Sequence, residues 1–227
     1  MPTLFIVATP IGNLEDITLR ALRVLKEADV ILCEDTRQTK KLLERHEIKN
    51  KQLTTHNERQ SGVAMEKILG WLEEGKNLAL VTDAGTPGIS DPGARLVAKV
   101  REHFGDSVSI VPIPGPSAVI AALSASGFQA DNFLFLGFLP HKKGRETLFK
   151  EIAASKRTIV FYESPHRILK TLEALAKHLG SRRVAVAREL TKLYEELRVS
   201  NAQELLSHFK KHPDTVRGEF AVLIEGK

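Results

Sequence analysis

Short apolar runs alternate with amphipathic segments through the first half of the chain. Five runs have the length of strands and cover residues 4–8, 30–33, 52–55, 77–81 and 108–113. Four segments between them carry apolar side chains at helical spacing, over residues 18–27, 36–45, 63–74 and 94–102. This alternation predicts an open, largely parallel sheet flanked by helices.

The second half predicts a mixed α/β domain. Helical patterns cover 118–125, a stretch ending near 154, one beginning at 168 and one from 201 to about 212, and apolar runs cover 133–136, 158–162, 183–187 and 218–225. Residues 112–117 hold three prolines and a glycine, which predicts a hinge between domains 1–113 and 114–227. The fold class that follows is α/β with two domains.

The loop over residues 83–93 is rich in Gly, Pro and Asp. Its glycines let backbone groups approach a ligand closely, and the helix start beyond them adds free N–H donors. We expect Asp91 to be the N-cap and Pro92 the first helical residue. Pro116 and Pro165 repeat this arrangement after other strands. Several helix N-termini that proline makes rigid, arranged around one pocket, favour a ligand site. The alternative interpretation is that each proline only ends a short loop.

Three more loops of the first half follow predicted strands, at residues 9–13, 34–37 and 112–117. Ligands of open α/β sheets bind outside the carboxyl ends of the strands. The sequence therefore predicts a ligand site at this edge.

Composition sets broad limits on the 227-residue chain. It is 42% hydrophobic and 27% charged, which is ordinary for a soluble protein, and no apolar run reaches the roughly 18 residues of a membrane span. Cys33 is the only cysteine, which excludes an internal disulfide or a thiolate zinc site and favours the cytoplasm. The net charge of +5 is compatible with RNA but is a weak argument.

Several familiar chemistries find no support in the sequence. Neither the P-loop pattern nor G-x-G-x-x-G follows a strand, which argues against a kinase, a P-loop ATPase and a Rossmann dehydrogenase. Ser117 lies in P-G-P-S rather than in the G-x-S-x-G pattern of hydrolases. His208 and His212 are four residues apart on a helix, where a solvated face is favoured over a zinc site. No metal is expected.

Two groups of cationic residues lie in a helix start and a loop. They are Arg37, Lys40 and Lys41, and His141, Lys142, Lys143 and Arg145. Phosphate contact is one interpretation and a solvated face is the other.

Six motifs resemble those of the small-subunit ribosomal RNA methyltransferases I, in the tetrapyrrole methylase superfamily. They are ATPIGNLEDIT (8–18), EDTR (34–37), DAGTPGISDPG (83–93), PGPSA (114–118), FYESPHR (161–167) and ARELTK (187–192). They occur in the family's order over nearly the whole chain. Family members usually continue for several tens of residues beyond the last strand, whereas this chain ends at Lys227, a difference that bears on RNA affinity.

The resemblance implies S-adenosylmethionine as methyl donor, bound in a cleft between two α/β domains, and a homodimer. It implies transfer to the ribose 2′-oxygen of a cytidine in the decoding region of small-subunit ribosomal RNA. The family's donor contacts correspond to Pro10, Asp83, Gly85, Thr86, Ile89, Ser117, Ala118, Tyr162 and Ala187.

A ribose hydroxyl is a poor nucleophile, so a base that removes its proton would assist transfer. Asp35, which follows the second strand, is the candidate base; its alternative role is N-cap of the next helix with Gln38 as capping-box partner. Candidates for RNA phosphate contacts are Arg37, Lys142, Lys143 and Arg145.

Two other functions remain open on the same fold, because fold does not determine substrate. One is methylation of a tetrapyrrole or another small acceptor. The other is a non-catalytic RNA-binding or ribosome-assembly factor.

Overall fold

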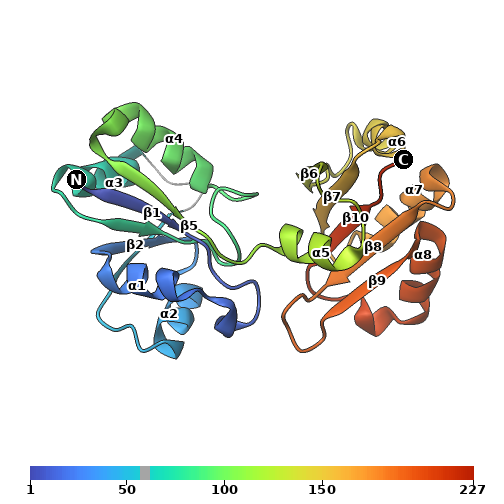
Figure 1. The fold of residues 1–227 in the computed structure, drawn as a ribbon, viewed down its shortest axis with the longest axis horizontal. Coiled ribbons are helices and arrows are strands. Elements are labelled where there is room, and N and C mark those ends of the chain that lie inside the picture. The colour runs from blue at the N-terminus through green and yellow to red at the C-terminus, as the bar shows by residue number, and fades with distance from the viewer. Residues whose placement is uncertain (57–61) are drawn as a thin grey trace. The chain divides into compact units, whose positions relative to one another are not determined.

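The computed structural model describes residues 1–56 and 62–227 (Figure 1). The chain forms two compact units, Met1–Ser117 and Ala118–Lys227. Each unit is built on one five-stranded sheet.

Unit 1 contains a fully parallel sheet. Its strands are β1 (Thr3–Val7), β2 (Val30–Cys33), β3 (Gln52–Thr55), β4 (Leu78–Leu80) and β5 (Ser109–Ile113), in the spatial order β3-β2-β4-β1-β5. Every pairing between them is parallel. The prediction of an open parallel sheet is confirmed.

Helices cover both faces of this sheet. They are α1 (Leu19–Glu27), α2 (Thr36–Arg45), α3 (Gly62–Glu73) and α4 (Gly93–Phe104), with short 3-10 turns at Leu14–Asp16 and Gly105–Ser107. Figure 1 shows α1 and α2 on one face and α3 and α4 on the other. In β2, Ile31 and Cys33 pack with α1 and α2, whereas Val30 and Leu32 pack with α3 and α4. Burial on both faces explains why β2 and β4, in which every residue is buried, are continuous apolar runs.

Unit 2 contains a mixed sheet. Its strands are β6 (Phe133–Phe138), β7 (Thr158–Glu163), β8 (Arg183–Arg188), β9 (Glu196–Asn201) and β10 (Phe220–Ile224), in the order β6-β7-β10-β8-β9. β6 and β7 are parallel, and the remaining pairs are antiparallel. This confirms the prediction of a mixed α/β second half.

The two faces of the second sheet are covered unequally. The helices are α5 (Ala118–Ser126), α6 (Arg145–Ala154), α7 (Ile168–Leu179) and α8 (Ala202–Lys211), followed by a 3-10 turn at Pro213–Thr215. α6, α7 and α8 pack on one face around Phe149, Phe161 and Phe209. Of the described helices, α5 alone packs on the other face, which leaves aromatic side chains at its margin partly exposed.

The edge strand β9 was missed by the sequence analysis, and the central strand β10 was predicted. β9 was not predicted, because this edge strand pairs only with β8 and the sequence Glu-Leu-Arg-Val-Ser-Asn has exposed polar positions. β10 lies within the predicted apolar run 218–225, and all its residues are buried. It lies between β7 and β8 with helices on both faces, so neither side reaches solvent.

The prediction that three prolines occupy first helical positions is wrong. Pro92 is the N-cap of α4 instead of Asp91, Pro116 precedes α5 by two residues, and Pro165 precedes α7 by three. At α7, the carbonyl of Ser164 accepts hydrogen bonds from the backbone of Arg167 and Ile168. A turn therefore separates the proline from the helix.

Among the described residues, no helix combines the length and apolarity that a membrane crossing requires.

Candidate active site

The loops that follow four neighbouring strands of unit 1 meet at the carboxyl edge of its sheet. Thr9, after β1, and Gly85, after β4, exchange backbone hydrogen bonds of 2.9 and 3.1 Å. The Thr9 hydroxyl also donates to the carbonyl of Thr82 at 2.9 Å. The Thr86 hydroxyl donates to the carbonyl of Pro116, after β5, at 3.3 Å. The backbone N–H of Asp35, after β2, donates to Asp83 Oδ1 at 3.0 Å, so the loops after all four strands form one continuous polar edge.

The loop over residues 83–93 is stiffened from within by Asp91. The carboxylate of Asp91 accepts from the backbone N–H of Gly88 at 2.8 Å and of Gly93 at 2.6 Å. A Cβ on Gly93 would lie 2.9 Å from Asp91 Oδ1 and 3.0 Å from the nitrogen of Gly88. Only glycine therefore allows this closed arrangement, and Ser90 adopts a left-handed backbone with φ +62° inside it.

Asp35 has a structural role in unit 1. Its carboxylate accepts from the Arg37 backbone N–H at 2.8 Å and caps α2. It also forms an ion pair of 2.7 Å with the guanidinium of Arg37. The hydrogen bonds from Arg37 lower the pKa of Asp35 to about 2. The N-cap interpretation is confirmed.

The capping-box partner predicted for Asp35 is wrong. The backbone N–H of Asp35 donates to Asp83 Oδ1 at 3.0 Å instead of to Gln38. This bond joins residues that are 48 apart in the chain, so no local pattern reveals it. It ties the loop after β2 to the loop after β4.

Glu34 is a candidate that the sequence interpretation missed. Its carboxylate accepts from the Thr82 hydroxyl at 2.6 Å. Burial raises the pKa of Glu34, and the charges of Asp91 and Asp83 raise it further. A half-buried carboxylate with a raised pKa at a strand end is typical of an active site. Glu34 directly follows the apolar run 30–33 and so lies at the predicted edge of the sheet. This position in the sequence could have indicated it as a site residue.

The residues implied as donor contacts fall into two groups. Pro10, Asp83, Gly85, Thr86 and Ile89 lie in the joined loops of unit 1, and Ser117 ends that unit.

Ala118, Tyr162 and Ala187 belong to unit 2. Ala118 begins α5, and Tyr162 and Ala187 both pair with Ala221 of β10. Tyr162 and Ala187 therefore lie on the face that α5 covers. Partial burial raises the pKa of the Tyr162 hydroxyl, which is hydrogen-bonded to the backbone of Val119.

The four candidate RNA-binding residues have different surroundings. Lys142 and Lys143 are exposed in the loop before α6, and Arg37 is 84% exposed although it is paired with Asp35. Arg145 is only 17% exposed, and its guanidinium lies 3.3 Å from the buried carboxylate of Glu163. Arg145 thus has a partner inside the protein, a role that its place in a run of basic residues did not indicate.

Glu163, Arg145 and Arg167 form a buried cluster, called here the Glu163 clamp. The Glu163 carboxylate lies 3.3 Å from Arg145 and 3.0 Å from Arg167, and it accepts from the Thr171 hydroxyl at 2.6 Å. Arg167 donates to the carbonyl of Leu139 at 2.7 Å. The clamp fixes the start of the loop that carries Lys142 and Lys143.

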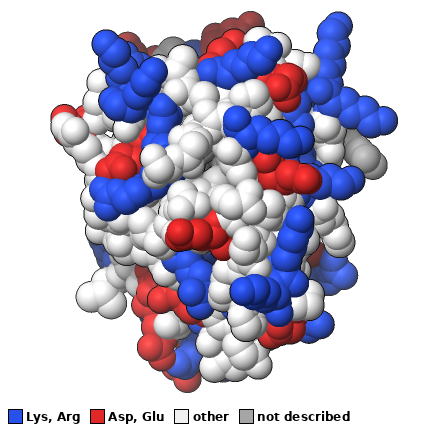
Figure 2. Space-filling view, turned by 90° about the vertical axis from the view of Figure 1, so that its right-hand side faces the viewer, with Lys and Arg blue, Asp and Glu red and all other residues white. Residues whose placement is uncertain are grey.

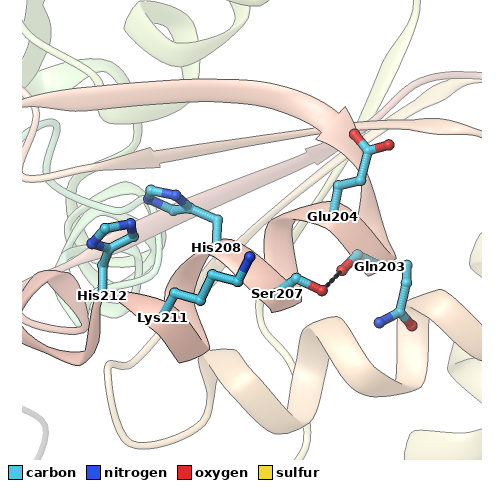
Figure 3. A pocket seen from close by; sticks show the side chains of 6 residues that line it. All are labelled: Gln203, Glu204, Ser207, His208, Lys211 and His212. Carbon is cyan, nitrogen blue, oxygen red and sulfur yellow. Dashed lines mark hydrogen bonds between the residues drawn. The ribbon is translucent and has the colours of Figure 1, made fainter.

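A shallow hollow of about 430 Å³ lies along α8. Figure 3 shows the rings of His208 and His212 side by side, with their centroids 4.7 Å apart. His208 packs against β9, 3.7 Å from Glu196, and burial lowers its pKa. Over residues 1–56 and 62–227, no cluster of three metal-binding side chains occurs.

Comparison with known proteins gives a consistent result. The model of the family "Tetrapyrrole (Corrin/Porphyrin) Methylases" matches residues 3–206. A relative from Thermotoga maritima, named ribosomal RNA small subunit methyltransferase I, is 47% identical over 100% of both chains. Relatives of the same name from Bacillus subtilis and Escherichia coli O157:H7 are 47% and 48% identical, over 100% and 98% of this chain and 76% and 77% of their own.

Solved structures share the fold at low sequence identity. A cobalt precorrin-4 methyltransferase matches with a TM-score of 0.72 and 19% identity, covering 98% of this chain and 94% of its own. Uroporphyrin-III-C-methyltransferase from Thermus thermophilus matches with a TM-score of 0.67 and 17% identity, covering 99% of this chain and 94% of its own. These likenesses support the fold class.

Proposed function

This chain belongs to the tetrapyrrole methylase family, and from that premise we propose that it transfers a methyl group from S-adenosylmethionine to small-subunit ribosomal RNA. The finer proposal is that the acceptor is the ribose 2′-hydroxyl of a cytidine in the decoding region. The observation that carries it is the 47% identity, over the full length of both chains, to a relative named for this activity.

The loops of unit 1 suit the donor chemically. S-adenosylmethionine has polar groups at both ends and, when bound, supplies an electrophilic methyl group on a sulfonium. Asp83 offers a carboxylate for its hydroxyl or ammonium groups, and the backbone of Gly85 and Thr86 offers further polar contacts. Because these loops are hydrogen-bonded to one another, little entropy is lost in ordering them. Ala118, Tyr162 and Ala187 are the proposed contacts in unit 2.

The protein contributes mainly alignment and proton removal. Holding the attacking oxygen about 3 Å from the methyl carbon lowers the barrier through proximity. A pKa of about 2 makes Asp35 a weak base. We therefore propose that Asp35 orients Asp83 through its backbone N–H, and that Glu34 is the better candidate for receiving the ribose proton.

The decisive experiment uses labelled donor and small ribosomal subunits that lack the modification. We expect label on a ribose oxygen of a cytidine, detected by mapping the methylated nucleotide. Label on a base, or only in small molecules, would contradict the proposal, and the second result would favour a small acceptor. Calorimetry with the donor alone separates both enzymes from a non-catalytic factor, because such a factor need not bind it.

A homodimer and a cytoplasmic location complete the proposal. Both follow from the resemblance and from the ribosomal acceptor. Light scattering of the purified protein tests the first, and fractionation of cells tests the second.

A further inference from the structure

Phe138 is a large aromatic side chain that is 60% exposed at the end of β6. Alternate residues of a strand face the same side, so Phe138 would ordinarily accompany Leu136 on the face of α6, α7 and α8. However, the pairing of β6 with β7 shifts register between Phe135 and Phe138. Gly137, at this shift, has a φ of +60°, a backbone conformation that glycine adopts without a steric penalty. The bulge turns Phe138 to the opposite face.

On that face Phe138 joins an aromatic cluster. Its ring centroid lies 5.5 Å from that of Tyr162, and Phe135 contacts the same tyrosine at 5.0 Å. Tyr162 thus supports Phe138 from one side, and more than half of the Phe138 side chain remains open to solvent. Bulges next to functional sites commonly re-aim one side chain in this way.

The residues after Phe138 are held by the Glu163 clamp. Arg167 donates to the carbonyl of Leu139 at 2.7 Å and Arg145 to that of Pro140 at 2.9 Å. His141, Lys142 and Lys143 follow at once and are exposed. The Glu163 clamp therefore fixes the segment that carries both the Phe138 ring and the basic loop directly after it.

We propose that Phe138 is a stacking platform for one nucleobase of single-stranded RNA, with Lys142 and Lys143 binding the neighbouring phosphates. This rests on the proposed function, because it assigns a contact for the RNA acceptor. Single-stranded RNA is bound by aromatic rings that stack on bases beside cations that follow the backbone.

Charge distribution supports this occupant. Figure 2 shows one face of the molecule, on which Lys and Arg are interspersed with Asp and Glu. In the loop after Phe138, residues 139–144 contain two lysines and a histidine and no acidic residue. Single-stranded RNA complements both features, because its bases can stack on the Phe138 ring and its phosphates can pair with the basic loop.

The test measures binding of the full chain to a fluorescent single-stranded RNA and to small ribosomal subunits that lack the modification. We expect F138A to weaken RNA affinity by about tenfold to a hundredfold, as loss of one base stack does. F138W, which keeps an aromatic ring at this position, should bind RNA as tightly as the wild type. F138L, which keeps apolar contact without a π-face, should behave like F138A. The slope of log Kd against log salt should stay unchanged, because no charge is lost.

Two sets of control variants separate stacking from other effects. K142A and K143A should each reduce the salt slope by up to about 0.7, as expected for one phosphate contact with a single strand. L134A removes a side chain that is 43% exposed on the same strand before the bulge, and it should leave RNA affinity unchanged. Equal melting temperatures of the variants and the wild type would exclude unfolding as the cause of weaker RNA binding.

Four outcomes would overturn the platform. They are unchanged RNA affinity in F138A, full affinity in F138L, weaker donor binding by F138A without RNA, and an altered mass in light scattering, which would indicate a second copy on this surface. Because affinity is measured without turnover, the result is independent of catalysis. Wild-type protein that binds RNA without methylating it would contradict the proposed function and leave the platform standing.

Discussion

At the scale of single residues, the carboxylates at the edge of the first sheet have distinct roles. The Asp91 carboxylate closes its own loop, and the Asp35 carboxylate caps a helix. Glu34 accepts a hydrogen bond from Thr82, and burial raises its pKa. Asp83 is held by the backbone of Asp35, and partial desolvation raises its pKa too. Such differences separate structural from reactive carboxylates.

The pH dependence of methyl transfer distinguishes Glu34 from Asp35. A base must be deprotonated, so the rate should rise with pH through the pKa of Glu34, which lies above the ordinary glutamate value of 4.5. E34Q should reduce kcat by about a hundredfold or more and abolish this rise, with donor affinity retained.

D35N is the matched control in this measurement. It should keep the rise, because a group with a pKa of about 2 is already ionised throughout the range. A rise that persists in E34Q and disappears in D35N would restore Asp35 as the base.

At the scale of elements, loops are fixed by contacts to distant segments. The 83–93 loop is closed by Asp91 and joined to loops after β1, β2 and β5. The loop after β6 is held by the Glu163 clamp. Rigid loops on a sheet scaffold preorganise a binding site.

G93A tests the importance of the closed 83–93 loop. The added Cβ meets Asp91 and Gly88 within about 3 Å, so the loop must shift. We expect a stability loss of about 1–3 kcal/mol and donor affinity lowered about tenfold, measured by denaturation and calorimetry. G70A is the control: a Cβ at Gly70 in α3 meets nothing within 4 Å, so it should gain up to about 1 kcal/mol. Unchanged donor affinity in G93A would remove this loop from the donor site.

E163Q tests the Glu163 clamp. Removing one partner of a buried ion pair costs about 3–5 kcal/mol, because the remaining charges stay buried, and here two arginines lose their counter-ion. Urea denaturation should show a loss of about 3 kcal/mol. The exposed pair Lys99–Glu102 provides the control, since E102Q should cost under about 1 kcal/mol. Equal effects would show that the clamp contributes no more than a surface pair.

At the scale of the whole molecule, two units with separate cores give two potential unfolding transitions. The proposed donor contacts are distributed over both units. A ligand that binds only the native state stabilises whatever it contacts.

Scanning calorimetry therefore tests the distribution of donor contacts. At a donor concentration about 100 times Kd, stability should rise by about 2.7 kcal/mol, and the transitions of both units should move to higher temperature. D83N should diminish the shift. A shift confined to one unit would contradict the contacts assigned to the other.

Local pattern alone determined much of this protein. The alternation of apolar runs and helical periodicity predicted the parallel sheet, and residues 36–45 and 52–55 coincide with α2 and β3. The apolar runs of β2 and β4 follow from the burial of every residue in these two strands. The helix predicted from residue 201 to about 212 likewise corresponds to α8, whose N-cap is Asn201. The motifs predicted the family, which the comparisons bear out.

Only the tertiary structure decided which partners the polar residues take. Arg145, a candidate for phosphate contact, pairs with Glu163, which lies 18 positions away. Asp35, the candidate base, donates its backbone N–H to Asp83, which lies 48 positions away. Phe138 faces the open side because one bulge reverses the alternation. Hydrogen bonds and ion pairs across such separations depend on how strands are ordered in the sheet, which no local spacing encodes.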